Sequence, residues 1–387
     1  MANWKDLLRK PGMAIEDAWD ELRSSFAKGL KLNDPVQIVP YRTYGTARRI
    51  YIKGRVLEDK GIASAGDSDT VLNNLLNMYK RFESDEVAGA TLKAVLADEA
   101  HEVTTDSEGY FVLDLNPLTP ILAEELWHPV RLELMSAPIP FDSALYTHAE
   151  VMIPPADAEY GIISDIDDTI VKTTATNLLA MSRITFLNNA KTRLPFAGVA
   201  EFYKALQLGR NGKRNNPFFY VSSSPWNLYD LLKDFLDLNK IPAGPLLLRD
   251  FGTNEKPKGD PHMSHKFKEI QQIFEAYPHL SFVLVGDSGQ EDPVIYREVV
   301  KQFPGRVLAI YIRDVQLPER KKVAVEVSQT LTEHKIEMII VSDTVEAARH
   351  AAERGLIFTE AIPAIEQDKK EDKGQEEGKI EASVAGK

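Results

Sequence analysis

The sequence predicts an α/β fold, in which a doubly wound parallel sheet follows an all-β sandwich domain. The first observation is that, from about residue 158, short apolar segments alternate with amphipathic helical segments, as in a parallel sheet covered on both faces. The second is that short segments rich in β-branched and aromatic residues, separated by turn signals, fill residues 35–156. The third is the length of 387 residues with 43% apolar residues, which suffices for two or three domains.

Residues 1–34 are predicted to form an N-terminal helical segment. Pro11 interrupts it, and its apolar residues recur at helical spacing: Trp4, Leu7, Leu8, Ile15, Trp19 and Leu22. Two interpretations of this apolar face are open. It packs against its own domain, or it forms a peripheral contact with a membrane.

Residues 35–156 are predicted to form an antiparallel sandwich of immunoglobulin-like or prealbumin-like type. The segment TTDSEGYF indicates a hairpin with a turn at 106–109. A helical insertion is expected at 69–82, because its leucines fall on one side of a helix. The expected strands are 48–59, 90–98, 101–115, 128–135 and 145–153. This region contains no cluster of residue types that would catalyse a reaction.

Residues 157–365 are predicted to form the parallel-sheet domain. Its expected strands are 161–166, 217–224, 245–251, 281–288, 306–314 and 336–343, with an amphipathic helix at 226–238 among the connections. Residues 366–387 are charged and poor in apolar side chains, so a disordered tail is expected there.

Composition excludes several classes of function. The formal net charge of -12 argues against a general nucleic-acid binder, because phosphate backbones require basic surfaces. The absence of cysteine excludes disulfides, thiolate metal sites and cysteine nucleophiles. No transmembrane run or signal peptide is apparent, so a cytoplasmic protein is expected, with a peripheral membrane contact as the alternative.

Three carboxylates, Asp165, Asp167 and Asp168, follow the first predicted parallel strand. Like charges at the end of an apolar strand repel one another and are poorly solvated, so they require a counter-charge. A calcium loop would need Gly at its sixth place and Glu at its twelfth, where the chain has Ile170 and Thr176. Helix capping would explain only one of the carboxylates. A magnesium ion explains the cluster better.

The other predicted strands also end in polar residues. In open α/β sheets the carboxyl ends of the strands form the site. The serines Ser222, Ser223 and Ser224 end the second strand, and Asp287 ends the fourth, with Asp292 just beyond it. Lys266 is expected at the same edge, with Lys256, Lys258 and Lys268 as competitors.

Asp-x-Asp-x-Thr, a hydroxyl, a basic residue and Gly-Asp-Ser-(three)-Asp, in this order, resemble the haloacid dehalogenase superfamily of phosphohydrolases. A narrower resemblance covers about residues 158–315. The segments SDIDDTI, FFYVSSSPWNLYD, LLLRDFG and FVLVGDSGQEDPVIY resemble the catalytic domain of the actin-patch phosphatidate phosphatase family and its bacterial relatives. The resemblance implies a magnesium-dependent phosphatase acting on phosphatidic acid.

The resemblance also implies roles for individual residues. Asp165 would be the nucleophile and a metal ligand, and Asp167 the general acid and base, with its backbone carbonyl on the metal. Asp287 would complete the magnesium site. These roles agree with general chemistry, because a carboxylate attacks a phosphoryl group once that group's charge is neutralised.

Phosphate contacts follow in the same way. Ser222 and Lys266 would hold the phosphoryl oxygens, together with Thr169 of the first motif, while Ser223 or Ser224 could replace Ser222. Asp292 is expected to support the site rather than bind the metal. Arg249 is expected either to contact substrate or to form an ion pair at the rim.

The spacing of the elements predicts an open cleft without a large cap. About 28 residues, 171–198, separate the first strand from its helix, whereas a lid domain would need roughly 50 or more. An open cleft favours a phosphate carried on a phospholipid or another large substrate. The alternatives are a phosphatase for phosphoproteins or soluble phosphomonoesters, and a non-catalytic phospho-receiver module.

Overall fold

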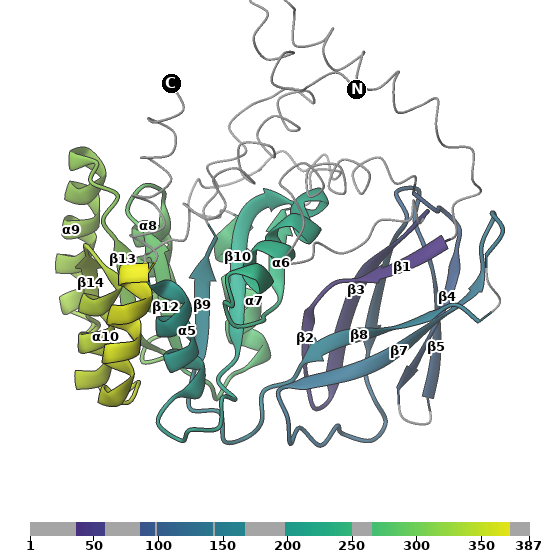
Figure 1. Ribbon diagram of the computed structural model, residues 1–387, viewed down its shortest axis with the longest axis horizontal. Coiled ribbons are helices and arrows are strands. Elements are labelled where there is room, and N and C mark those ends of the chain that lie inside the picture. The colour runs from purple at the N-terminus through teal and green to yellow at the C-terminus, as the bar shows by residue number, and fades with distance from the viewer. Residues whose placement is uncertain are drawn as a thin grey trace, which may run out of the picture.

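The computed structural model describes residues 36–58, 86–96, 99–141, 144–166, 198–249 and 265–371. Within these residues the chain forms two parts that lie side by side, a mostly antiparallel β-domain, in which β2 and β8 pair in parallel, and a parallel α/β domain (Figure 1). The helices expected at 1–34 and 69–82 lie outside the described residues. No helix in the described ranges has the length and apolar content needed to span a bilayer.

In the part of the β-domain that the structure describes, eight strands form one continuous sheet. Along β6 and β7 buried and exposed residues alternate, as expected for strands with one face on a core. The strands are β1 (Val36–Pro40), β2 (Thr43–Thr46), β3 (Arg49–Glu58), β4 (Thr91–Leu96), β5 (Glu99–Thr104), β6 (Tyr110–Leu115), β7 (Trp127–Ser136) and β8 (Tyr146–Met152).

The sheet folds over so that its two halves share one apolar core. One half contributes Ile52 and Phe111 from β3 and β6, and the other contributes Leu92 and Leu132 from β4 and β7. All four side chains are almost completely buried. Each predicted strand segment of the β-domain overlaps an observed strand, and segment 101–115 is divided between β5 and β6.

The hairpin predicted at TTDSEGYF, within segment 101–115, is wrong, because the strands on its two sides do not pair with each other. The turn itself forms, because Asp106 Oδ1 accepts hydrogen bonds from the amides of Glu108 and Tyr110, and Gly109 has a φ of 73°. However, β5 pairs with β4, whereas β6 pairs with β3. The turn therefore carries the chain from one half of the sheet to the other, since a local turn motif does not choose the partner strand.

The parallel sheet has six strands in the order β11-β10-β9-β12-β13-β14. Strands β9 and β12 are buried along their whole length, because helices cover both faces of the sheet. The strands are β9 (Gly161–Asp165), β10 (Phe218–Pro225), β11 (Leu246–Arg249), β12 (Phe282–Asp287), β13 (Val307–Arg313) and β14 (Met338–Val341).

The helices divide into two layers around this sheet. One core cluster contains residues of α5 (Val199–Leu208), α6 (Tyr229–Leu238) and α10 (Thr344–Glu353). The other cluster, on the opposite face, contains residues of α7 (His265–Ala276), α8 (Asp292–Gln302) and α9 (Pro318–Thr332). Two 3-10 turns, η2 (Trp226–Leu228) and η3 (Thr359–Ala361), and a last helix over residues 362–371 complete the described elements. The prediction of an α/β domain with a parallel sheet is thus confirmed.

The two domains pack against each other through aromatic and charged side chains. Arg42 of the β-domain binds both carboxylate oxygens of Asp237 on α6, at 2.8 and 3.2 Å, and also contacts Glu150. At the other end of the junction, the Tyr277 hydroxyl donates to the carbonyl of Gly45 at 2.8 Å. These contacts fix the β-domain against α6 and α7.

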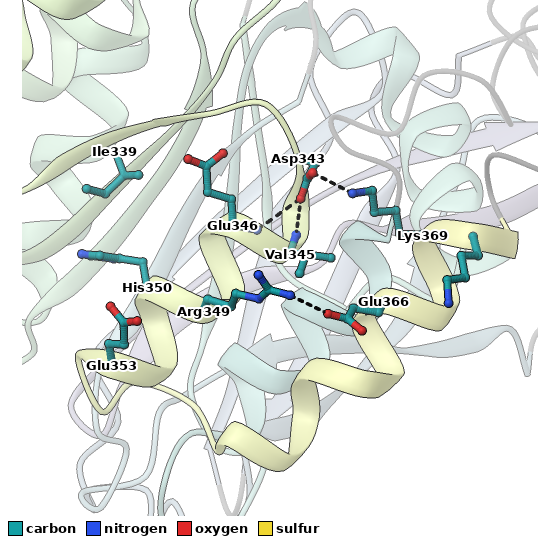
Figure 2. A pocket seen from close by; sticks show the side chains of 10 residues that line it. Ile339, Asp343, Val345, Glu346, Arg349, His350, Glu353, Glu366 and Lys369 are labelled. Carbon is teal, nitrogen blue, oxygen red and sulfur yellow. Dashed lines mark hydrogen bonds and ion pairs between the residues drawn. The ribbon is translucent and has the colours of Figure 1, made fainter.

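The predicted start of the disordered tail at residue 366 is wrong. Residues 362–371 form a helix, in which the side chain of Ile365 is completely buried. Lys369 Nζ lies 2.6 Å from Asp343, and Glu366 lies 2.9 Å from Arg349. Figure 2 marks both ion pairs with dashed lines. Composition failed here because one buried isoleucine and ion pairs, rather than a broad apolar face, hold the helix on α10. Residues 372–387 lie outside the described residues.

Candidate functional site

The candidate site lies where the order of the parallel strands reverses. Asp165 ends β9, and the neighbouring strands β10 and β12 carry Ser222 and Asp287 at the same edge. The first connection leads from β9 to β10 on one side, and the chain later returns to β12 on the other. Such a switch point opens a crevice beyond the carboxyl ends of the strands.

Lys266 forms ion pairs with two carboxylates of this crevice, Asp165 and Asp292. It lies in the first turn of α7, and its Nζ is 2.7 Å from Asp165 Oδ1 and 3.1 Å from Asp292 Oδ1. Gln290 Oε1 accepts a third contact at 2.8 Å. The Lys266 side chain is 6% exposed, so these contacts form in a nearly dry environment.

Asp292 supports the end of β12. Its Oδ2 accepts a hydrogen bond from the backbone N–H of Asp287 at 3.1 Å, while its Oδ1 faces Lys266. The carboxylate packs so closely on Gly286 that a Cβ there would lie 2.5 Å from Asp292 Oδ2. This contact explains why the strand needs glycine at that position. Asp292 therefore touches both a proposed phosphate ligand and the backbone of a proposed metal ligand, as expected for a supporting residue.

The buried charge of the site is unbalanced. Burial raises the pKa of Asp165 well above its ordinary value, the carboxylates of Asp292 and Asp287 raise it further, and the Lys266 ammonium opposes them. Three buried carboxylates face one buried ammonium. Hence a bound cation at this edge would offset the remaining negative charge.

The serines after β10 differ in their exposure. Ser222 and Ser224 are fully buried, and the amide of Ser224 donates to Ser222 Oγ at 3.0 Å. Ser223 is half-buried. The regular pairing of β10 with β11 shifts register between Val221 and Pro225, so the serine segment departs from the ladder.

The remaining predicted site residues differ in where the structure places them. Lys268 is exposed, whereas Lys266 touches Asp165, so the geometry favours Lys266 of these two lysines. Arg249 is exposed at the end of the edge strand β11, opposite Pro225. Several predicted residues lie outside the described residues: Asp167, Asp168, Thr169, Lys256 and Lys258. The absence of a large cap was predicted for residues 171–198, and nearly all of that range is also outside the described part.

Sequence reasoning missed Gln290, and it included Gly286 in a motif without predicting its close contact with Asp292. The spacing of Gln290 carries no signal, because a glutamine between a glycine and a glutamate is ordinary in a loop. Gly286 precedes Asp287 directly, and a glycine inside a buried strand is a recognised indication of close approach by another group. That signal could have revealed the packing of Asp292.

The described residues do not hold a complete metal site by themselves. No three carboxylate or imidazole side chains among them gather closely enough to hold a cation. Magnesium, however, uses one or two protein carboxylates and takes its other ligands from water and phosphate. Asp165 and Asp287 therefore supply a donor set of the kind that this ion accepts.

A separate groove of about 610 Å³ lies beside β14, α10 and the last helix (Figure 2). It lies at the edge of the sheet opposite β11, with β12 and β13 between β14 and β9. Its charged side chains largely pair with each other, as in Asp343–Lys369 and Arg349–Glu366. It is therefore a weaker candidate site than the crevice at Asp165.

Fold and site together define a class of protein, an α/β domain whose parallel sheet carries an Asp–Lys–Asp–Ser constellation at its switch point. Residues 160–314 match the profile of the family described as "Phosphatidate phosphatase APP1, catalytic domain". The resemblance predicted from the motifs is thus confirmed over this segment.

Two curated relatives match about half of the chain. Phosphatidate phosphatase APP1 of Saccharomyces cerevisiae is 33% identical over 218 residues, which cover 54% of this chain and 34% of the relative. An uncharacterised protein of Schizosaccharomyces pombe is 27% identical over 216 residues, covering 55% and 34%. The match thus covers about a third of the length of these curated relatives.

A likeness to a solved structure is weak. A carbohydrate acetylesterase from Xanthomonas citri aligns with 78% of this chain and 74% of its own at 9% identity, with a TM-score of 0.25. A score this low supports no conclusion about fold or function.

Proposed function

We propose that the chain is a magnesium-dependent phosphatase that hydrolyses a phosphomonoester, with phosphatidate as the favoured substrate. The observation that carries the proposal is the buried contact of Lys266 with Asp165, at the switch point of the sheet in a domain of the APP1 catalytic family. The activity printed in the name of the yeast relative supports this substrate. In the same proposal the α/β domain has a haloacid dehalogenase fold, and the β-domain is an immunoglobulin-like or prealbumin-like sandwich.

Magnesium would be held by Asp165 and Asp287, with the backbone carbonyl of Asp167. Its chemistry would be to neutralise charge on the phosphoryl oxygens of the substrate. The excess of buried carboxylate over ammonium fits such a divalent cation.

The protein groups would then act in two steps. In the first, a carboxylate oxygen of Asp165 forms a bond to phosphorus as the ester P–O bond breaks, and Asp167 gives its proton to the departing alcohol oxygen. In the second, Asp167 takes a proton from water, whose oxygen attacks phosphorus and releases inorganic phosphate, so that the Asp165 carboxylate is restored.

Lys266 and Ser222 would hold the transferring phosphoryl group. The ammonium of Lys266 is already directed at the Asp165 oxygen, so it lies beside the atom that would form the new bond. Preorganised donors of this kind stabilise charge in the transition state without having to move. Thr169 would add a contact from the first motif, and Ser223 or Arg249 would touch the substrate farther from phosphorus.

A direct test is the activity of purified wild-type protein and of Asp165→Asn and Asp167→Asn. Phosphatidate in mixed micelles, sugar phosphates, nucleotides and phosphopeptides would be compared, with and without Mg²⁺. We expect hydrolysis of phosphatidate with Mg²⁺, and losses of at least about a hundredfold in both variants, as for the loss of general acid–base catalysis. A clear preference for a soluble metabolite would refute the substrate, and an active Asp165→Asn would refute the mechanism.

A further inference from the structure

A nearly buried lysine of the β-domain contacts the α/β domain close to the candidate site. Lys53 lies on β3 and is 9% exposed. On β3 its neighbours Ile52 and Gly54 are buried, with Ile52 in the core of the β-domain, whereas Lys53 points toward the other domain. A buried ammonium is costly unless a partner compensates it.

The first partner of Lys53 is Trp226. Lys53 Nζ lies 4.0 Å from the centroid of the Trp226 ring, within the range of a cation–π contact. Tyr41 of the β-domain stacks on the same ring at 5.1 Å with an interplanar angle of 11°. The backbone N–H of Tyr41 donates to the carbonyl of Lys53 at 2.9 Å, which holds these two side chains beside each other.

Trp226 directly follows the serine segment of the site. Ser222 and Ser224 lie two to four residues before it, where the pairing of β10 with β11 shifts register. The ladder therefore does not fix this segment by itself. Trp226, held by Lys53 and Tyr41, anchors the end of the segment from the side of the β-domain.

The charge of Lys53 also acts on Glu269 of α7, which lies one turn after Lys266. Burial raises the pKa of Glu269 to about 7, and the positive charge of Lys53 opposes this rise. Lys53 thus contacts the turn that follows the strand of Ser222 and acts by its charge on the helix that carries Lys266. These two residues are the proposed ligands of the phosphoryl group.

We infer that Lys53 is a positioning residue that holds the serine segment, through Trp226, in register with α7 for phosphate binding. This inference rests on the proposed function of Ser222 and Lys266. It assigns to the β-domain a part in the catalytic unit, since Lys53 lies outside the family's matched region at 160–314. The lysine itself touches neither phosphorus nor the leaving group.

The test measures binding of inorganic phosphate to the full chain by calorimetry with Mg²⁺ present. Variants Lys53→Met and Trp226→Leu should each weaken binding by about fivefold or more, the size of an ordinary coupling between touching side chains. If Lys53 acts through Trp226, the double variant should be no weaker than the weaker single variant. Lys53→Arg should retain most of the affinity, because a guanidinium also stacks on an aromatic face.

Lys93→Met is the matched control, because Lys93 also lies in the β-domain and pairs with Glu133 at 2.9 Å. It should bind phosphate like the wild type. Unchanged binding in Lys53→Met, or additive losses in the double variant, would overturn the inference. If Lys53→Met does not fold, as judged by circular dichroism, Tyr41→Leu removes the ring that stacks on Trp226 and should cause the same loss.

The outcomes separate the two proposals. If the wild type hydrolyses phosphomonoesters and Lys53→Met binds phosphate normally, only the positioning role fails. If the wild type neither hydrolyses them nor binds phosphate, the proposed function fails and the positioning role fails with it.

Discussion

At the scale of single residues, the site is governed by the balance of buried charge. Asp165, Asp287 and Asp292 are each less than one-tenth exposed, and Lys266 is the buried ammonium among them. The carboxylates of Asp292 and Asp287 add to the effect of burial in raising the pKa of Asp165, and so disfavour its ionised state. The arrangement thus opposes stability, and the proposed cation would offset part of this cost.

Replacement of Lys266 tests this balance. Lys266→Met should lower the free energy of unfolding by about 3 kcal/mol, because it leaves two buried carboxylates without their ammonium. Urea unfolding with and without Mg²⁺ would measure the loss, and added Mg²⁺ should restore part of it. The control is the exposed neighbour in Lys268→Met, which should unfold like the wild type. Equal stability of Lys266→Met and wild type would contradict the charge argument.

A second residue-scale prediction concerns Glu269, whose pKa is raised by burial from 4.5 to about 7. A carboxyl group with a raised pKa holds its proton more tightly in the folded state, so its contribution to stability falls as pH rises from about 4.5 to about 7. Above pH 7 the ionised group remains a fixed cost.

Glu269→Gln should therefore be more stable than the wild type at pH 8, by about 1 to 3 kcal/mol, and nearly equal to it at pH 5. Thermal unfolding at the two pH values would show this. The exposed Glu275 on the same helix provides the control, because Glu275→Gln should shift neither value. A difference that is the same at pH 5 and pH 8 would contradict the assignment to Glu269.

At the scale of elements, a few contacts decide whether a segment folds onto the domain. The helix at 362–371 contributes one completely buried side chain, Ile365, and ion pairs to Asp343 and Arg349. Its second residue is Pro363, which suits the first turn of a helix. The amide of Glu201 on α5 also donates to Asp368 at 3.1 Å. The helix thus joins α5 and α10.

Two truncations distinguish this helix from the residues that follow it. Removal of residues 372–387 should leave the melting temperature unchanged, because their composition has too little apolar surface to offset ordering entropy. Removal of 362–387 should lower stability by about 2 to 5 kcal/mol, the usual cost of losing a buried isoleucine. Differential scanning calorimetry of both truncated chains would measure this. Equal melting of the two would show that the helix contributes nothing.

At the scale of the whole molecule, the two domains share side-chain packing. Tyr41 of the β-domain belongs to the core cluster of α5, α6 and α10, and Met152 belongs to that of α7, α8 and α9. Arg42 adds a two-oxygen contact with Asp237 on α6. Because both cores of the α/β domain include residues of the β-domain, neither domain would be left intact if the other unfolded.

We therefore expect the chain to unfold in one cooperative thermal transition. The calorimetric and van't Hoff enthalpies should agree, which is the criterion for two-state unfolding. Arg42→Met removes charge contacts but not the aromatic packing, so it should lower the melting temperature without splitting the transition. Two resolved peaks in the wild type would indicate that the domains unfold separately.

The polar residues at the ends of the parallel strands, the division into β and α/β parts, and the resemblance of the second part to the APP1 catalytic domain could all be read from the sequence. These features are local, since apolar runs, periodicity and short motifs are carried by neighbouring residues. Residues Asp165, Ser222, Lys266 and Asp287 could thus be named in advance, and the structure brings them to one edge of the sheet.

Only the tertiary structure decided contacts between residues far apart in the chain. It separated the strands of the supposed hairpin at 101–115, favoured Lys266 over Lys268, and placed Lys53 on Trp226. It also gave the helix at 362–371 a surface to pack on. In each case the local sequence pattern was compatible with more than one arrangement. The choice depended on which groups could share a buried environment, and this depends on the folded neighbourhood rather than on adjacent residues.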